Sequence, residues 1–141
     1  MIRLWDAISG QMRWSRVGDS RQVLQLLFSP DNKLLAAGNA DHTVKLWDVA
    51  TGEVQDTLRG HSSWVWELAF SPNGRILATS SGLTKLWDIE SGRQLASFGW
   101  GYAPASLAFS PNGQALAQGG AHGNVVLWDV EAALSTPPAT E

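Results

Sequence analysis

Three histidines are the residues of this chain whose chemistry most readily suggests a metal or an acid–base site. They are His42, His61 and His122. Zinc-binding histidines lie at short fixed spacings, as in His-Glu-x-x-His, whereas these three lie far apart. The chain also has no Gly-x-Ser-x-Gly sequence, no phosphate-binding glycine loop and no carboxylate pair at a catalytic spacing. The sequence therefore predicts no catalytic site, no metal site and no cofactor.

Four aspartates recur, and each directly follows a tryptophan. The pairs are Trp5-Asp6, Trp47-Asp48, Trp87-Asp88 and Trp128-Asp129. Successive tryptophans of this set are 42, 40 and 41 residues apart, and a steady period of this size indicates stacked supersecondary units. An aspartate at the end of a strand starts a turn by accepting hydrogen bonds from the backbone that follows. The repeat thus explains these aspartates without catalysis.

Two kinds of turn sequence recur within each period. Phe-Ser-Pro is followed by Asp-Asn or Asn-Gly at 28–32, 70–74 and 109–113, and Ser-Gly or Thr-Gly ends at Gly10, Gly52 and Gly92. Proline presets φ for a tight turn, and Asn or Gly accepts the left-handed conformation. The runs between the turns are about six residues long, which is strand length, and lack helical periodicity. We expect an all-β chain of four-stranded antiparallel sheets that stack on one another.

Composition places the chain among packed globular proteins. Hydrophobic residues make up 44% and charged residues 16%, and the net charge of −3 includes no basic stripe of the kind that binds nucleic acid. The chain contains no cysteine, no apolar run long enough for a membrane helix and no signal-peptide pattern at its N-terminus. These features predict a soluble, cytoplasmic protein without nucleic-acid or membrane partners.

The Phe-Ser-Pro-Asn-Gly and Lys-Leu-Trp-Asp sequences resemble those of the WD-repeat β-propellers, over residues 1 to about 130. The resemblance implies a partial propeller of stacked four-stranded blades, each with strands a to d from the inside outwards. It divides the chain into an incomplete first blade at 1–17 (strands c and d), a second blade at 18–59, a third at 60–98, a last blade at 99–130 without a clear outer strand, and a flexible tail at 131–141.

In that family, a hydrogen-bonded group of His, Ser or Thr, Asp and Trp staples each blade. The third unit matches best, with His61, Thr79 and Trp87, although its b–c turn is two residues short and lacks the Asp. In the second unit Asp19 and Ala37 stand in place of the His and the hydroxyl, and the last unit keeps only the tryptophan. Such a network stabilises a blade only where its members are satisfied, so we expect the blades to be held mainly by apolar stacking.

About three and a half blades are encoded, whereas propellers typically have four to eight. An open arc would expose the apolar side of each terminal blade. Three readings follow: the chain is the C-terminal part of a longer propeller protein, it is a truncated reading frame, or it closes as a homo-oligomer. In the last case residues 11–17 could supply the outer strand of another copy, giving six blades in a dimer, although residues 1–6 would then duplicate Val125–Trp128.

The strongest signal for binding is a pair of tryptophans at the start of a unit. On a strand, Trp64, Trp66 and Leu68 would share one face, with Val65 opposite. In the family the matching positions lie where strand a leaves the narrow top face, a frequent contact surface. The predicted partner-binding residues are Trp64, Trp66, Gln22, Leu24, Trp100 and Tyr102. The competing interpretation is that the two rings pack between neighbouring blades.

These features predict a non-enzymatic scaffold that presents a propeller face to a protein or peptide partner. The alternative is the truncated C-terminal regulatory or sensory portion of a larger signalling protein. Aromatic anchors favour the first function, because interface hot spots are rich in tryptophan. The fold alone does not identify the partner.

Overall fold

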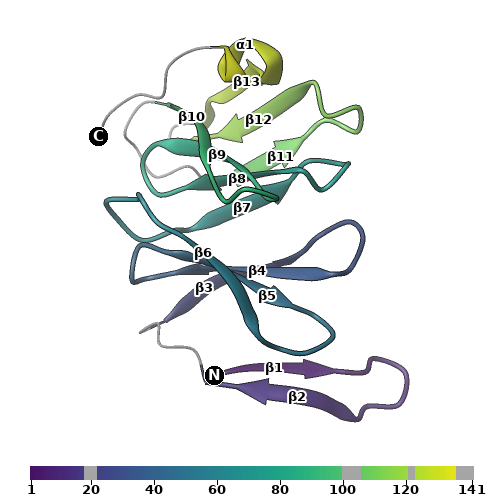
Figure 1. Cartoon of the computed structure of the whole chain (residues 1–141). Coiled ribbons are helices and arrows are strands. Elements are labelled where there is room, and N and C mark those ends of the chain that lie inside the picture. The colour runs from purple at the N-terminus through teal and green to yellow at the C-terminus, as the bar shows by residue number, and fades with distance from the viewer. Residues whose placement is uncertain (18–21, 100–105, 121–122, 136–141) are drawn as a thin grey trace.

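A computed structural model describes residues 1–17, 22–99, 106–120 and 123–135 of the chain. These residues are almost entirely β-structure (Figure 1). The strands are β1 (Ile2–Trp5), β2 (Met12–Arg16), β3 (Val23–Phe28), β4 (Leu34–Asn39), β5 (Val44–Asp48), β6 (Val54–Leu58), β7 (Glu67–Phe70), β8 (Ile76–Ser80), β9 (Thr84–Asp88), β10 (Gln94–Phe98), β11 (Ser106–Phe109), β12 (Ala115–Gly119) and β13 (Val125–Asp129). The predicted all-β class is confirmed.

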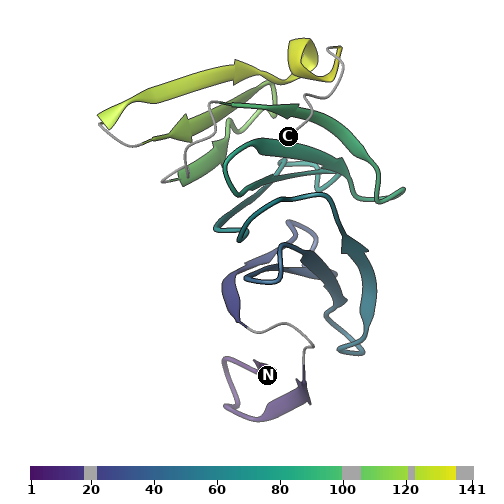
Figure 2. The same cartoon turned by 90° about the vertical axis from the view of Figure 1, so that its left-hand side faces the viewer.

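Four antiparallel sheets follow one another in chain order. The first sheet contains β1 and β2, the second β3 to β6, the third β7 to β10, and the fourth β11 to β13. We name the strands of a complete sheet a to d, so that β1 and β2 correspond to c and d, and β11 to β13 correspond to a, b and c. The sheets form a single row with the first and fourth at opposite ends (Figures 1 and 2). This arrangement agrees with a partial propeller.

The a–b turns close in the way their sequence requires. In the second of these turns, Ser71 Oγ accepts from Ile76 N at 2.9 Å, and Gly74 N donates to Ser71 O at 2.8 Å. Gly74 has a φ of 70°, a backbone conformation that residues with a Cβ atom seldom adopt. The repeated Ser-Pro-Asn-Gly sequence therefore sets the hairpin geometry locally.

Apolar side chains fill the space between successive sheets. The three clusters include Trp14, Leu35 and Trp47 between the first and second sheets, Leu46, Leu77 and Trp87 between the second and third, and Leu86, Leu107 and Leu116 between the third and fourth. Full burial of one leucine or a similar side chain contributes about 1.5–3 kcal/mol. Contact between sheets, rather than any one sheet alone, is thus the main apolar contribution to stability.

A short helix, α1 (Val130–Leu134), follows β13 where a complete sheet would continue to strand d. Asp129 caps it by accepting a hydrogen bond from Ala132 N at 2.7 Å, and Val130 and Ala133 are buried against the third sheet. Residues 131–134 thus differ from the flexible tail expected there, because the cap and the buried face order them. Residues 136–141 of that tail lie outside the described residues. No helix in the described ranges has the length and apolar character needed to cross a membrane.

Candidate interaction surface

Trp64 and Trp66 form an exposed aromatic pair just before β7. Their ring centroids lie 5.4 Å apart with the planes tilted by 44°. The two side chains are 44% and 41% exposed, so neither ring is buried between neighbouring sheets. Exposed aromatic residues of this kind, close together, provide a ready anchor site for a partner's side chains.

The rings point outwards because the residue between them is fixed inwards. Val65 is fully buried between the second and third sheets, and its N–H donates to Asn39 O at 3.1 Å. Its carbonyl lies so close to Gly38 that a Cβ there would approach Val65 O to 2.8 Å. A glycine at this place in β4 is therefore required for the close approach.

The strand expected from Trp64 onwards begins later, at Glu67. Trp64 and Trp66 lie on one side, as expected, but Leu68 does not share their exposure and instead packs in the same buried cluster as Val65. The alternation of sides is thus interrupted between Trp66 and Leu68, where the segment that pairs with both Asn39 and Ser80 passes into β7.

A partly buried carboxylate directly follows the tryptophan pair. Burial raises the pKa of Glu67, while a hydrogen bond from the Gln25 side chain opposes this shift. Gln25 belongs to β3, so the contact joins the innermost strands of two neighbouring sheets. The aromatic pair therefore has an acidic group next to it in the chain.

The other predicted partner-binding residues are less well defined. Gln22 is exposed, and its carbonyl accepts from Ala40 N at 2.9 Å, whereas Leu24 is half-buried within β3. Gln22 directly precedes β3 and Leu24 lies near its start, at the same end of the sheets as Trp64. Trp100 and Tyr102 lie outside the described residues. Their role in binding stays a prediction.

The third sheet also contains a group of buried side chains that are joined by hydrogen bonds. Thr79 Oγ1 accepts from Trp87 Nε1 at 2.8 Å and lies 2.6 Å from His61 Nε2. Ser81 Oγ lies 2.7 Å from the other ring nitrogen, Nδ1. The sequence pattern pointed to the first three residues but not to Ser81. The family pattern includes an aspartate that this unit lacks, and only the Ser-Ser-Gly sequence of the shortened turn could have suggested Ser81 as a further partner of the histidine.

The equivalent tryptophans differ in how their indole nitrogens are satisfied. Trp128 Nε1 donates to Gln118 Oε1 at 3.0 Å, and Gln118 occupies the register position of Thr79. Trp47 is more deeply buried, at 3% exposure, but its Nε1 has no hydrogen-bond partner among the described residues, because Ala37 replaces the hydroxyl. Trp5, on the terminal strand β1, is 54% exposed. One sequence motif thus occupies three different environments.

Replacing Ala37 by serine should supply the missing acceptor. Ala37 and Ala36 are neighbours in β4, fully buried, and face opposite sides of the sheet, with Ala37 in the cluster of Trp47. We expect Ala37→Ser to raise the free energy of unfolding by about 1 kcal/mol, the usual net value of one hydrogen bond. The matched control Ala36→Ser should lower it by about 1–3 kcal/mol, because its hydroxyl would enter an apolar cluster. Urea denaturation measures both, and a loss in both variants would contradict the assignment.

The recurring aspartates form turns. Asp6, Asp48 and Asp88 each accept a hydrogen bond on Oδ1 from the backbone N–H three residues later, at 2.7–2.8 Å. Two hydrogen bonds hold the pKa of Asp88 below its ordinary value: the larger effect comes from the Ser91 hydroxyl and the smaller from the Ser91 backbone N–H. In the described part of the chain, no three His, Asp or Glu residues gather in a way that could hold a metal ion.

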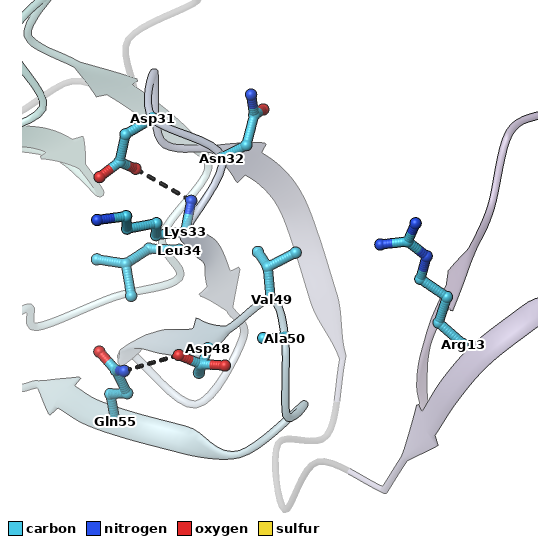
Figure 3. Close-up of a pocket in the computed structure, with 9 residues that line it drawn as sticks. All are labelled: Arg13, Asp31, Asn32, Lys33, Leu34, Asp48, Val49, Ala50 and Gln55. Atoms are coloured by element: carbon cyan, nitrogen blue, oxygen red, sulfur yellow. Dashed lines mark hydrogen bonds between the residues drawn. The ribbon is translucent and has the colours of Figure 1, made fainter.

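A pocket of about 640 Å³ lies at the opposite end of the sheets, between the first hairpin and the second sheet (Figure 3). It is lined by Arg13, Asp31, Asn32, Lys33, Leu34, Asp48, Val49, Ala50 and Gln55. Asp31 accepts from Lys33 N at 3.0 Å, and Gln55 Nε2 donates to Asp48 at 3.0 Å. Arg13 comes from the other wall, on β2, and pairs with Asp6 at 2.9 Å. The carboxylates of this pocket are thus already engaged in turn structure.

Comparison with protein families finds three matches to the family described as "WD domain, G-beta repeat", at residues 11–48, 52–88 and 92–129. No curated protein sequence matches the chain. Each matched segment begins with a strand d and continues with strands a, b and c of the next sheet. The outer strand of the second sheet, like that of the third, therefore belongs to the matched segment that forms the inner strands of the next sheet. Each such segment links two neighbouring sheets, through the chain itself and through the backbone hydrogen bonds of its outer strand.

Proposed function

Because this chain belongs to the WD-repeat family, we propose that it is a non-enzymatic scaffold that binds a protein or peptide at the surface around Trp64 and Trp66. WD-repeat proteins generally act as protein-interaction scaffolds and are typically not enzymes. The observation that carries the proposal is the exposure of two neighbouring tryptophans on a backbone fixed by buried Val65.

The chemistry of this surface favours a partner with a cationic or apolar anchor. The faces of indole rings attract both kinds of group, and a cation on an exposed ring contributes about 0.5–1 kcal/mol. Glu67 follows directly in the chain, and the net charge of the whole protein is −3. A peptide with an arginine or lysine beside an apolar residue would match these features.

The fixed backbone also supports binding. Trp66 N donates to Ser80 O at 3.0 Å, and Val65 N donates across to the second sheet, so both neighbouring sheets hold the segment. A surface that is ordered before binding loses less conformational entropy when a partner docks. The buried group formed by His61, Thr79 and Trp87 lies in the same sheet and stabilises it from within.

Peptides selected from a random library on the wild-type protein should lose affinity for variants of the tryptophan pair. We expect Trp64→Ala and Trp66→Ala each to weaken binding by roughly tenfold or more, since hot-spot residues contribute about 2 kcal/mol or more. Fluorescence anisotropy with labelled peptides measures the change. Substitution of exposed surface residues affects folding little, so stability should stay nearly constant.

Val54→Ala serves as the matched control. Val54 is a comparably exposed apolar residue, at 43%, and lies near the c–d turn at the opposite end of the second sheet. Peptide affinity should be unchanged in this variant. Equal affinity of the wild type and both tryptophan variants would remove Trp64 and Trp66 from the binding surface.

The second candidate function is a regulatory or sensory portion of a larger signalling protein. The exposure of Leu26 and Phe28, whose counterparts are more buried in the third sheet, favours a role in which further blades cover the second sheet. In-phase coding sequence for further repeats or a catalytic domain would support this function. Peptide binding by the isolated chain that depends on Trp64 would instead favour the first.

A further inference from the structure

The two terminal sheets are incomplete in complementary ways. The first sheet has only strands c and d, whereas in the fourth strands a, b and c are followed by α1. In the described ranges, β1 pairs with β2 alone, so the edge that would meet a strand b is open. The β1–β2 pairing shows an irregularity between Leu4 and Trp5, as β5–β6 does between Leu46 and Trp47. The first hairpin therefore has the geometry of strands c and d within a complete sheet.

The second sheet has an uncovered apolar area next to this open edge. Leu26 and Phe28 on β3 are 49% and 45% exposed. The register equivalents of Leu26 in the next two sheets, Leu68 and Leu107, are only 3% and 7% exposed because the preceding sheet covers them. Leu68 packs in a cluster that includes Leu27 and Ala36, from strands a and b of the preceding sheet. Leu107 packs likewise in a cluster that includes Ala69 and Ala78.

The pocket beside the first hairpin corresponds to the place of a missing a–b turn. Where one complete sheet precedes another, a proline of the first lies against a glycine of the next: a Cβ added at Gly74 would lie 3.6 Å from Pro30, and one at Gly113 would lie 3.4 Å from Pro72. The residue equivalent to these glycines in the second sheet is Asn32, which lines the pocket. A proline from a preceding a–b turn would fill this space.

The strand most easily exchanged is β13, because it repeats the sequence and position of β1. A Leu-Trp-Asp sequence begins within each of them, and both are strands c. On β13, Val125 and Leu127 are 72% and 71% exposed, although the same positions of β5 and β9 are fully buried. On β5 and β9 these positions pack against the following sheet, so this side of β13 lacks the packing that its internal counterparts have.

We propose that two copies of this chain associate by strand exchange, with β1 and β2 of each copy adding to β11 and β12 of the other in place of β13. Each composite sheet then has strands a and b from one copy and strands c and d from the other. The first hairpin keeps its present place on the second sheet, held by Trp14 Nε1 donating to Val49 O at 2.8 Å and by buried Ile2. The pair closes as a ring of six sheets, within the range usual for propellers.

Register and side chains fit this composite sheet. Leu116 pairs with Trp128 and Gln118 with Val126 in the fourth sheet, so β1 in the same place puts Trp5 opposite Leu116 and Arg3 opposite Gln118. Trp5 would then take the place of Trp128, whose ring lies 4.5 Å from that of Phe98. Ala108 and Ala117 of one copy would cover Leu26 of the other, and Pro111 would lie against Asn32.

The mass in solution tests the association. We expect light scattering to give twice the 15.2 kDa of one chain at micromolar concentrations. Trp5→Ala should raise the dimer dissociation constant at least about a hundredfold, because the composite sheet buries this ring. Ile8→Ala is the matched control on the same hairpin: Ile8 is 100% exposed in the β1–β2 turn, and its replacement should leave the mass unchanged. A monomer at every concentration would overturn the proposal and leave the open edge to strands from another source.

Disulfide trapping tests the strand exchange itself. The chain has no cysteine, so Arg3→Cys combined with Gln118→Cys introduces one defined pair. Oxidation should produce a covalent dimer on a non-reducing gel, because these positions become opposite neighbours in the composite sheet. The control variant, Arg13→Cys with Gln118→Cys, carries the same change on β12 and should stay uncrosslinked, since Arg13 lies on strand d. A dimer that gives no crosslink in the first variant would overturn the composite sheet.

Discussion

Thr79→Val should lower the free energy of unfolding by about 2–4 kcal/mol, because it leaves two buried polar groups without the partner they now share. Valine matches threonine in shape, so the substitution removes the hydroxyl and almost nothing else. Thr79 is fully buried, and its Oγ1 accepts from Trp87 Nε1 and contacts His61 Nε2. Urea denaturation followed by tryptophan fluorescence, at one fixed protein concentration, measures the loss.

Thr79→Ser is the matched control for this effect. Serine keeps the hydroxyl at the centre of the hydrogen-bonded group and removes only one buried methyl, which should cost about 1 kcal/mol. The predicted order of stability is therefore wild type, Thr79→Ser, then Thr79→Val. Equal losses in the two variants would show that the hydroxyl adds nothing beyond packing. The interpretation of His61, Thr79 and Trp87 as a stabilising group would then be wrong.

Trp87→Phe should destabilise the protein by about 2–3 kcal/mol, through loss of ring volume and of one buried hydrogen bond. Trp47→Phe should cost about 1–2 kcal/mol less. The two rings are almost equally buried, at 2% and 3% exposure, and both lie between sheets. They differ in that Trp87 Nε1 donates to Thr79, while Trp47 Nε1 has no partner in the described ranges. Removing the indole N–H therefore breaks a hydrogen bond at residue 87, whereas at residue 47 it removes a buried donor that has no acceptor.

Chemical denaturation of both variants, analysed at the same concentration, gives this difference directly. A parallel measurement on Ala37→Ser combined with Trp47→Phe provides the control. If the introduced serine acts through the indole nitrogen, its stabilising effect should disappear when residue 47 is phenylalanine. Equal losses in Trp47→Phe and Trp87→Phe would indicate that ring packing alone determines the contribution of these tryptophans.

Local features of the fold could be predicted from the sequence because short-range interactions determine them. The Ser-Pro-Asn-Gly turns close through Ser71 and Gly74, within five residues of one another. Asp48 and Asp88 start their turns through hydrogen bonds to N–H groups three residues later. The period of about 40 residues followed from the spacing of these turns and of the tryptophans. All these contacts are contained within one repeat.

The candidate site was only partly predictable, since contacts between repeats shape it. The sequence pointed to Trp64 and Trp66, but the exposure of both rings depends on Val65 packing against Gly38 of the preceding sheet. The same contact, together with the late start of β7, separates Leu68 from the aromatic pair. The contact of Ser81 with His61 was not predicted, because the distance between them depends on the path of a shortened turn.

By itself, the sequence determined the β-strands, their turns, the repeat and the family, because these depend on residue types at short, regular spacings. The tertiary structure alone decided which copies of a motif are equivalent. Trp5, Trp47 and Trp87 share one sequence motif, yet one ring is exposed, one is buried without a partner for its nitrogen, and one is buried and hydrogen-bonded. The environment of each ring is set by the neighbouring sheet, and the sequence of a single repeat carries no information about what lies beside it.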